Sequence, residues 1–465
     1  MTGLLHMNRT PLLISAAAVA VFSGPVHAQS ADEVEALRAQ VAQMSAQLAE
    51  LNARLDQVET EVDAVPEAVA VAVAAAPAPA VSHPTVTAGS ATEISMGAAP
   101  EIESDDGFSF KPFGRIMLDA GWTALPGGLG LGDGFDAEAR RVRLGVQGDI
   151  PGGFGYKMEV DFAGNEVVIT DALIEYGAGD FDITVGQFNN FQSMEELTSS
   201  RFTSFIERAA FTDAFGFTRR AGVAVEYGGG NVLLQGGVFS DNLEDLPGSD
   251  RWSVDGRAVF YPEVGDTQLH FGGSLHYAEI GEGETVRYRQ RPLVHFTSNR
   301  LINTGSFGAT SEFGAGVELA AIKGPFHFAA EGYRQEVSGV PAMQDAVFHG
   351  GFVEAGMFLT SGDSRGYSGG RFNRTRPNTP VGEGGIGAVQ LNVRYDYLEL
   401  NDADAGIVGG TQNGFLTSLI WTMTDYTRFQ INYGRLDYSD AVLALPSGDS
   451  DYGADVIGMR AEIDF

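Results

Sequence analysis

The stretch YKMEVDF, residues 156–162, alternates apolar and charged side chains at every position. A β-strand turns successive side chains to opposite faces, so this pattern predicts a strand with one apolar and one charged face. The same alternation returns in VQLNVRYDY at 389–397 and in RFQINY at 428–433. Period-two segments of this kind continue from Phe108 to Phe465 and define an all-β region.

Two architectures fit this alternation. In a soluble sandwich the apolar face meets a second sheet, whereas in a membrane barrel it meets lipid and the polar face lines the lumen. The densely charged polar face, repeated over a dozen or more segments, favours the barrel. Met459, Ile463 and Phe465 share one face of the last segment. A Phe that ends an alternating strand resembles the signal read by the outer-membrane assembly machinery. We therefore expect an all-β, transmembrane antiparallel β-barrel.

The N-terminus predicts export. Arg9 precedes an apolar run at 11–24, and small residues near Ala28 resemble a cleavage site, so residues 1–28 are predicted to be a signal peptide. No later run of about 18 apolar residues predicts a membrane helix. The chain contains no cysteine, which excludes a disulfide scaffold. These features predict a Gram-negative cell outer-membrane location.

Two segments precede the barrel, which is predicted at 106–465. Residues 29–62 contain a heptad repeat of apolar residues over 33–62, which predicts a coiled-coil helix and self-association. A lone amphipathic helix docked on another surface is the alternative, and a periplasmic partner such as peptidoglycan is compatible with either. Residues 63–105 are rich in Ala and Pro and predict an extended linker.

Strand number follows from parity, because short turns face the periplasm and long loops face the exterior. Counting back from Phe465 predicts sixteen strands and assigns the strand-like stretch 285–296 to an external loop, 280–310. The predicted strands are 108–122, 138–150, 154–162, 167–177, 180–187, 218–227, 231–240, 251–261, 266–279, 311–322, 326–337, 347–360, 386–400, 413–424, 426–438 and 452–465. Two further long connections, 188–217 and 361–385, are also rich in arginine. A lumen this wide needs such loops to narrow it.

The net charge of −32 argues against nucleic-acid binding, which requires a basic surface. Of the 29 basic residues, 26 are Arg. Arginine offers a rigid fork of donors that suits oxyanions, although genome composition explains the bias equally well. Arg287, Arg289 and Arg291 fall on one side of an extended segment, which predicts an anion pathway. The alternative is that the arginines pair with lumenal carboxylates and hold inserted loops in place.

Residues 138–210, which begin EARRVRLGVQGDIPGGFGYKMEVDF, resemble the phosphate-selective porin O and P family. So do 359–372, LTSGDSRGYSGGRF, and 382–402, GEGGIGAVQLNVRYDYLELND. The resemblance implies a homotrimeric barrel of sixteen strands with two external loops and one periplasmic connection folded into the pore. It also implies an arginine ladder at Arg287, Arg289 and Arg291, an eyelet at Arg115, Arg140 and Arg141, and an acidic position near the eyelet at Glu175. The loop 188–217 contains no lysine, unlike phosphate-specific members.

These observations predict a passive porin for small anions, including phosphate or polyphosphate, with a general or cation-leaning porin as the alternative. The predicted anion pathway comprises Arg115, Arg140, Arg141, Arg143, Arg201, Arg208, Arg287, Arg289 and Arg291, with Arg371, Arg374 and Arg376 on the periplasmic side. An enzyme would need a nucleophile and a base, or paired acids. No histidine of the predicted mature chain has a hydrolase or metal-ligand spacing, so we expect neither catalysis nor a cofactor or metal.

Overall fold

The computed structural model describes residues 92–164, 166–246, 249–281, 283–339 and 344–465. The predicted signal peptide, the coiled coil and most of the predicted linker lie outside these residues. No helix in the described ranges is long and apolar enough to cross a membrane.

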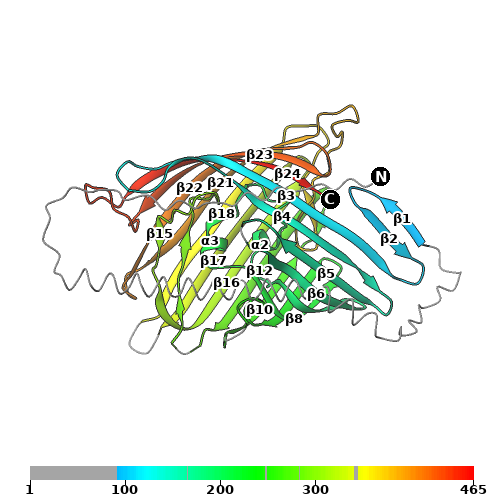
Figure 1. Cartoon of the computed structure of the whole chain (residues 1–465), viewed down its shortest axis with the longest axis horizontal. Helices are drawn as coiled ribbons and strands as arrows, with labels where there is room; N and C mark the ends of the chain where they lie inside the picture. Colours follow the sequence, from blue (N-terminus) through cyan, green and yellow to red (C-terminus); the bar gives the residue numbers. More distant parts are fainter. Residues whose placement is uncertain (1–91, 165, 247–248, 282, 340–343) are drawn as a thin grey trace, which may run out of the picture. The chain divides into compact units, whose positions relative to one another are not determined.

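Sixteen antiparallel strands form a closed barrel (Figure 1). Each strand pairs with the next along the chain, and the last strand pairs with the first through Asp464 and Arg115, which closes the ring. The strands are β3 (Ser109–Ala124), β4 (Gly134–Ile150), β5 (Phe154–Asp161), β6 (Val168–Ala178), β7 (Phe181–Asn189), β8 (Arg219–Gly229), β9 (Val232–Phe239), β10 (Trp252–Phe260), β12 (Thr267–Glu279), β16 (Phe307–Lys323), β17 (Phe326–Gly339), β18 (Ala346–Phe358), β21 (Ala388–Asp402), β22 (Ile407–Thr422), β23 (Thr427–Ser439) and β24 (Tyr452–Asp464).

All sixteen predicted strands are confirmed, and the predicted strand-like stretch in 280–310 lies outside the wall. The observed connection, residues 280–306, is here called loop 5, and its described residues carry the short strands β13 (Thr285–Val286), β14 (Arg289–Gln290) and β15 (Ile302–Asn303). A two-residue strand, β11 (Glu263–Val264), lies in the turn before β12. We call the end with the short turns the periplasmic end and the opposite end the external end.

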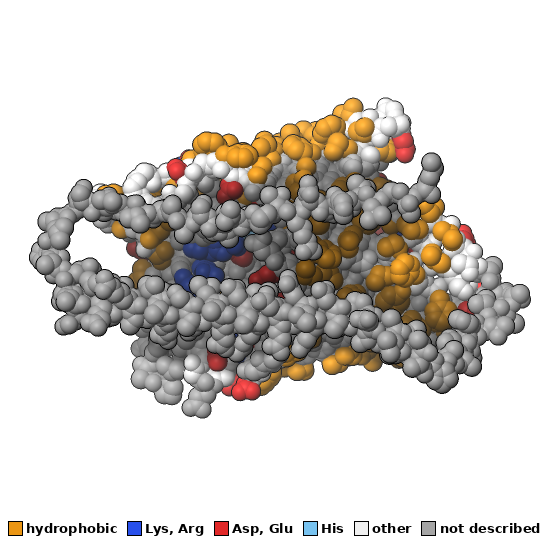
Figure 2. Space-filling model, viewed as in Figure 1, with side chains coloured by type: hydrophobic (Ala, Val, Ile, Leu, Met, Phe, Trp, Pro, Cys, Tyr) orange, Lys and Arg blue, Asp and Glu red, His pale blue; other side chains and the backbone are white. Residues whose placement is uncertain are grey.

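The two faces of each strand differ as the alternation predicts. On β21, Val393 is 54 % exposed on the outer surface, whereas Arg394 and Asp396 are buried inside the barrel. In Figure 2, hydrophobic side chains lie over much of the visible wall. An apolar outer surface around a polar interior is the arrangement of a barrel that meets lipid, not of a soluble sandwich.

One domain boundary needs correction. Residues 92–104, predicted to be part of an extended linker, form a hairpin of β1 (Thr92–Met96) and β2 (Pro100–Ser104). β2 pairs with the start of β3 through Ile102 and Phe110. An ion pair of 2.6 Å between Lys111 and Glu101 also joins the hairpin to the barrel. The alternating segment TEISM is too short to stand out beside the Ala/Pro-rich stretch that precedes it.

The chain's last residue completes the closure of the barrel. The Phe465 N–H donates to the Gly114 carbonyl, and the Gly114 N–H donates to the Phe465 carbonyl, each over 3.0 Å. A β-carbon on residue 114 would lie only 2.7 Å from the Phe465 ring, so the glycine leaves room for the aromatic side chain. Phe465 therefore belongs to the seam between the first and last strands.

We expect Phe465→Ala to lower the yield of folded barrel in the outer membrane several-fold, because the seam loses its terminal aromatic contact. Heat-modifiable migration of the outer-membrane fraction on a gel measures this yield. Phe415→Ala, which removes another exposed aromatic ring from the outer wall, is the control. Equal yields for both variants would contradict a special role for the last residue.

Candidate functional site

Loop 3, residues 190–218 between β7 and β8, crosses the lumen to the opposite wall. It carries two short helices, α2 (Met194–Leu197) and α3 (Ala210–Ala214), and both contact elements far away in sequence. Glu195 of loop 3 forms an ion pair with Arg394 on β21 at 2.8 Å. The Ala210 N–H donates to Asp396 over 3.2 Å. These contacts fix the loop inside the barrel.

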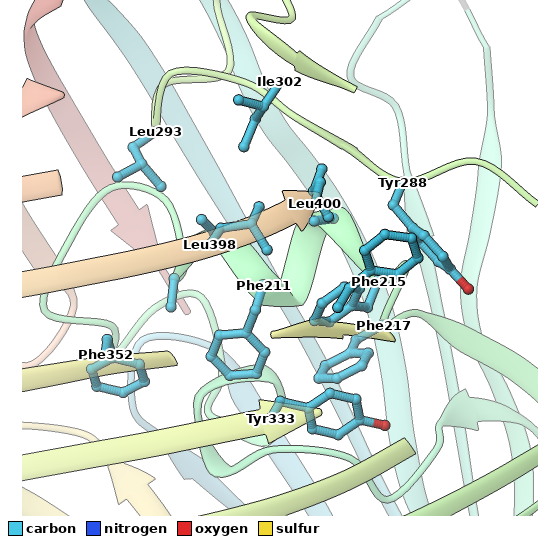
Figure 3. Packing of buried hydrophobic residues seen from close by; sticks show 14 of the residues in the cluster. Phe211, Phe215, Phe217, Tyr288, Leu293, Ile302, Tyr333, Phe352, Leu398 and Leu400 are labelled. Carbon is cyan, nitrogen blue, oxygen red and sulfur yellow. The ribbon is translucent and has the colours of Figure 1, made fainter. Parts of the chain in front are cut away.

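An apolar cluster fills the space between loop 3 and strands β17–β24, and we call it the plug. Phe211 on α3 stacks on Tyr333 and Phe352 of the wall, with ring centroids 6.0 and 6.5 Å apart (Figure 3). The buried members of the plug include Phe205, Ile206, Phe211, Phe215, Phe217, Tyr288, Leu293, Ile302, Tyr333, Phe348, Phe352, Leu398 and Leu400. The polar pathway is therefore displaced toward the opposite side of the lumen, along β3–β9.

Two cavities follow this side of the lumen. The upper cavity, of about 250 Å³, lies toward the external end between loop 3, loop 5 and β4. The lower cavity, of about 400 Å³, is lined by residues of β3–β9, loop 3 and a periplasmic hairpin. Five residues line both cavities and define what we call the neck: Arg141, Arg143, Glu196, Arg208 and Arg219.

Three of the four arginines in the neck are neutralised. Arg143 forms ion pairs with Glu159 at 3.0 Å and with Asp161 at 2.7 Å. Arg219 pairs with Asp171 at 2.6 Å. Arg208 lies 3.4 Å from the Glu196 carboxylate and donates to three backbone carbonyls of loop 3. Arg143 and Arg219 thus link strands of the wall, and Arg208 links two parts of loop 3.

Arg141 is different. Its side chain is buried, yet no carboxylate of the described ranges lies within 4.0 Å of it, and its nearest polar contact is the Met117 sulfur at 3.8 Å. A buried guanidinium without a counter-charge is costly, and a passing anion would lower that cost. Glu207 and Glu196 act on Arg141 electrostatically from beyond ion-pair distance, so Arg141 is the neck arginine that forms no ion pair with a described carboxylate.

A β-bulge brings Arg140 into the lumen as well. In the pairing of β3 with β4, Met117 is opposite Arg141 and the next residue, Leu118, is opposite Ala139. Arg140 therefore has no partner on β3 and is the extra residue of the bulge. Arg140 pairs with both carboxylate oxygens of Glu207 in loop 3, at 2.8 and 3.0 Å. Burial alone would raise the pKa of Glu207, but Arg140 and its neighbours hold that pKa well below its usual range.

Loop 5 carries the external arginines. Exposure alternates along 286–290, so Arg287 and Arg289 lie on the solvent side and Arg291 lines the upper cavity. Among the described residues none of the three forms an ion pair with a carboxylate; Arg287 donates to Asn303 over 2.9 Å and Arg291 to the Thr297 carbonyl over 3.1 Å. Burial and repulsion from Arg291 lower the pKa of Arg300 to about 10.

Residues 114–465 match the family described as phosphate-selective porin O and P. The chain belongs to this family. This porin is therefore an outer-membrane β-barrel of a family of channels.

One further relative and one solved structure are similar to this chain. An uncharacterized protein of Caulobacter vibrioides is 44 % identical over 455 residues, which cover 94 % of this chain and 91 % of the relative. The structure of outer-membrane expressed OmpT of Vibrio cholerae has a TM-score of 0.50 at 10 % identity, covering 80 % of this porin and all of that chain. The structural likeness concerns the fold alone.

Below the neck of this porin lies the base of loop 3. Arg115 pairs with Glu159 and donates to Ser200 over 3.0 Å. Arg201 reaches the periplasmic end of β24, where it pairs with Asp464 at 3.1 Å. Both predicted pathway arginines are thus compensated by carboxylates, although both line the lower cavity.

The periplasmic connection 359–387 folds back under the lumen as a hairpin of β19 (Gly366–Ser368) and β20 (Arg371–Asn373). Tyr367 contacts His270 at 2.7 Å, and Arg257 donates to the Gly370 carbonyl over 2.7 Å, which holds the hairpin to the wall. Arg371 lines the lower cavity and forms no ion pair with any described carboxylate.

Three predicted residues lie away from the neck. Arg374 pairs with Asp464 at the periplasmic end, and Arg376, whose side chain is 76 % exposed, lies 3.9 Å from Asp425. Neither lines the neck or the lower cavity. Glu175 is not a neck residue, but it lines the lower cavity together with Arg115 and Arg141.

The sequence prediction missed the carboxylates that pair with the neck arginines, namely Glu159, Asp161, Asp171 and Glu196, and also Glu207, which pairs with Arg140. A signal was present for the first two, because they alternate with apolar residues in YKMEVDF and so face inward. The loop carboxylates Glu196 and Glu207 carry no such periodicity. The plug was also missed, since alternation by itself predicts a polar interior throughout.

Proposed function

We propose that this porin is an anion-preferring diffusion channel for small inorganic anions, with phosphate or polyphosphate as its leading solutes. The observation that carries the proposal is Arg141, a buried and unpaired guanidinium at the neck that both cavities share. Every solute that follows these cavities passes this charge. A fixed positive charge at a constriction favours anions over cations.

The loop 5 arginines support the same direction of selectivity. Arg287, Arg289 and Arg291 lack carboxylate partners among the described residues, and Arg291 lines the upper cavity above Arg141. The net charge of −32 repels anions at long range, but screening limits that effect to a Debye length of about 8 Å at physiological salt. Contacts inside the lumen therefore decide selectivity.

The second candidate is a general or cation-leaning porin. Arg115, Arg140, Arg143 and Arg201 all pair with carboxylates, which is what a purely structural role of the arginines requires. Under this alternative the paired arginines hold loop 3, and the acidic surface concentrates cations.

Replacing Arg287, Arg289 and Arg291 together with Gln tests the proposal. We expect phosphate to block chloride current in the wild-type porin and to block it several-fold less in the triple variant, because the approach to the neck loses three unpaired charges. Single-channel conductance in chloride with added phosphate measures the block. The control variant Arg334→Gln/Arg435→Gln removes arginines from the outer wall, and equal phosphate block in the triple variant and the wild type would contradict the pathway.

Three assembly features belong to the same proposal. We expect a homotrimer, recognition of the Phe465 strand by the outer-membrane assembly machinery, and self-association or a periplasmic partner through residues 29–62. Deletion of 33–62 followed by crosslinking of subunits and assay of envelope attachment separates the coiled coil's contribution from that of the barrel.

A further inference from the structure

The sign of the wall's charge reverses below the neck. Inward-facing positions near the periplasmic ends of β4, β6, β7 and β8 carry four carboxylates, which we call the acidic rim: Asp149, Glu175, Asp182 and Glu226. Glu175 and Glu226 line the lower cavity together with Arg141. The same pathway therefore passes a basic constriction and then an acidic exit.

The members of the rim lie close to one another. Asp182 and Glu226 are directly opposed in the β7–β8 ladder. Glu175 Oε2 and Asp149 Oδ1 lie 3.6 and 3.7 Å from the point where a β-carbon of Gly155 would be, so no side chain separates them there. Asp149, Asp182 and Glu226 repel Glu175, whereas Lys157 attracts it.

The described cations do not neutralise this rim. None of the four carboxylates forms an ion pair with a described residue; Asp149 accepts from Ser109 over 2.7 Å and Glu226 accepts from Gln235 over 2.7 Å. Lys157 is engaged with Asp171 at 2.7 Å. Below the neck, Arg371 on the periplasmic hairpin is the one arginine of the described cavity lining that forms no ion pair, and the rim carboxylates that act on it are Glu175 and Glu226.

We propose that this arrangement makes the porin a rectifying channel, with a conductance that depends on the sign of the voltage. The inference rests on the proposed function, in which anions are the majority carriers at the neck. In the basic zone the mobile carriers are anions, and in the acidic zone they are cations, because fixed charge enriches its counter-ions. Two zones of opposite sign in series conduct unequally in the two directions.

The direction follows from the order of the zones. When the periplasmic side is positive, anions move down from the neck and cations move up from the rim, so both accumulate where the zones meet. The opposite polarity draws both carriers away and depletes that region. Conductance is therefore larger when the periplasmic side is positive, and salt suppresses the difference as the Debye length falls from about 10 Å at 0.1 M to about 3 Å at 1 M.

The absence of cysteine from the chain allows the rim charge to be changed in a channel that already conducts. We expect wild-type single channels in 0.1 M KCl to pass about twofold more current at one polarity than at the other and to lose this asymmetry at 1 M. Glu226→Cys should reduce the asymmetry. A methanethiosulfonate reagent carrying a sulfonate should restore it, and one carrying an ammonium group should abolish or reverse it.

The same reagents give the orientation of each channel, because the introduced thiol reacts faster from the periplasmic chamber. Glu263→Cys, in the periplasmic turn and outside the cavity lining, is the control and should leave the asymmetry unchanged with either reagent. The inference would be overturned by a wild-type current at 0.1 M that is equal at both polarities. It would also be overturned if the asymmetry did not change with the charge attached at position 226. A reversal potential of the wild type that indicates cation selectivity would instead refute the proposed function. The two measurements therefore distinguish failure of the rectification proposal from failure of the proposed function.

Discussion

Arg141→Gln is expected to lower the anion-over-cation permeability ratio of the channel about fivefold. An unpaired charge contributes about 1 kcal/mol to the free energy of an ion some 4 Å away in water, and 1.4 kcal/mol corresponds to a factor of ten. Arg141 is the neck guanidinium without a carboxylate partner among the described residues, so its loss is not offset by an existing pair. The reversal potential in a KCl gradient measures the ratio.

Arg208→Gln is the matched comparison, because Arg208 lines the same two cavities but is neutralised by Glu196 and loop carbonyls. We expect it to destabilise loop 3 while changing selectivity much less than Arg141→Gln. Equal losses of selectivity in the two variants would show that pairing does not determine which arginine acts on the solute.

Phe211→Ala is expected to loosen loop 3 and to raise the single-channel conductance, with frequent transitions between levels. Phe211 is 1 % exposed at the centre of the plug, and removal of such a ring from a core costs about 3–5 kcal/mol. Current recordings at fixed voltage report both the mean conductance and its fluctuations.

Phe313→Ala serves as the control for this variant, since Phe313 is 42 % exposed on the outer wall and contributes nothing to the plug. Conductance of the control should match the wild type. A quiet channel of wild-type conductance in Phe211→Ala would mean that the ion pairs alone hold loop 3 across the lumen.

The strands were predictable because period two is a local property of the chain. Counting back from Phe465 also assigned loop 5 correctly. An additional strand in that stretch would have made the number odd and would have moved the short turns before it to the opposite end of the barrel. The bulge at Arg140 was not predictable in this way, because one extra residue reverses the side to which a charge points.

The interior was less predictable than the wall. On β21 the inward face carries Arg394 and Asp396 near its middle but Leu398 and Leu400 above, and the sequence alone does not say that a loop will cover those leucines. Likewise, Arg394 pairs with Glu195, 199 residues away, as well as with Glu354 on the neighbouring strand. Which arginines are paired, and hence which remain for the solute, depends on such long-range contacts.

The most direct measurement of the central claim is the zero-current potential of the wild-type porin across a planar bilayer with a KCl gradient. An arginine-lined neck with Arg141 unpaired predicts a potential of the sign that chloride permeation produces. A potential of the opposite sign, set by potassium, would contradict anion preference and leave the arginines with a structural role only.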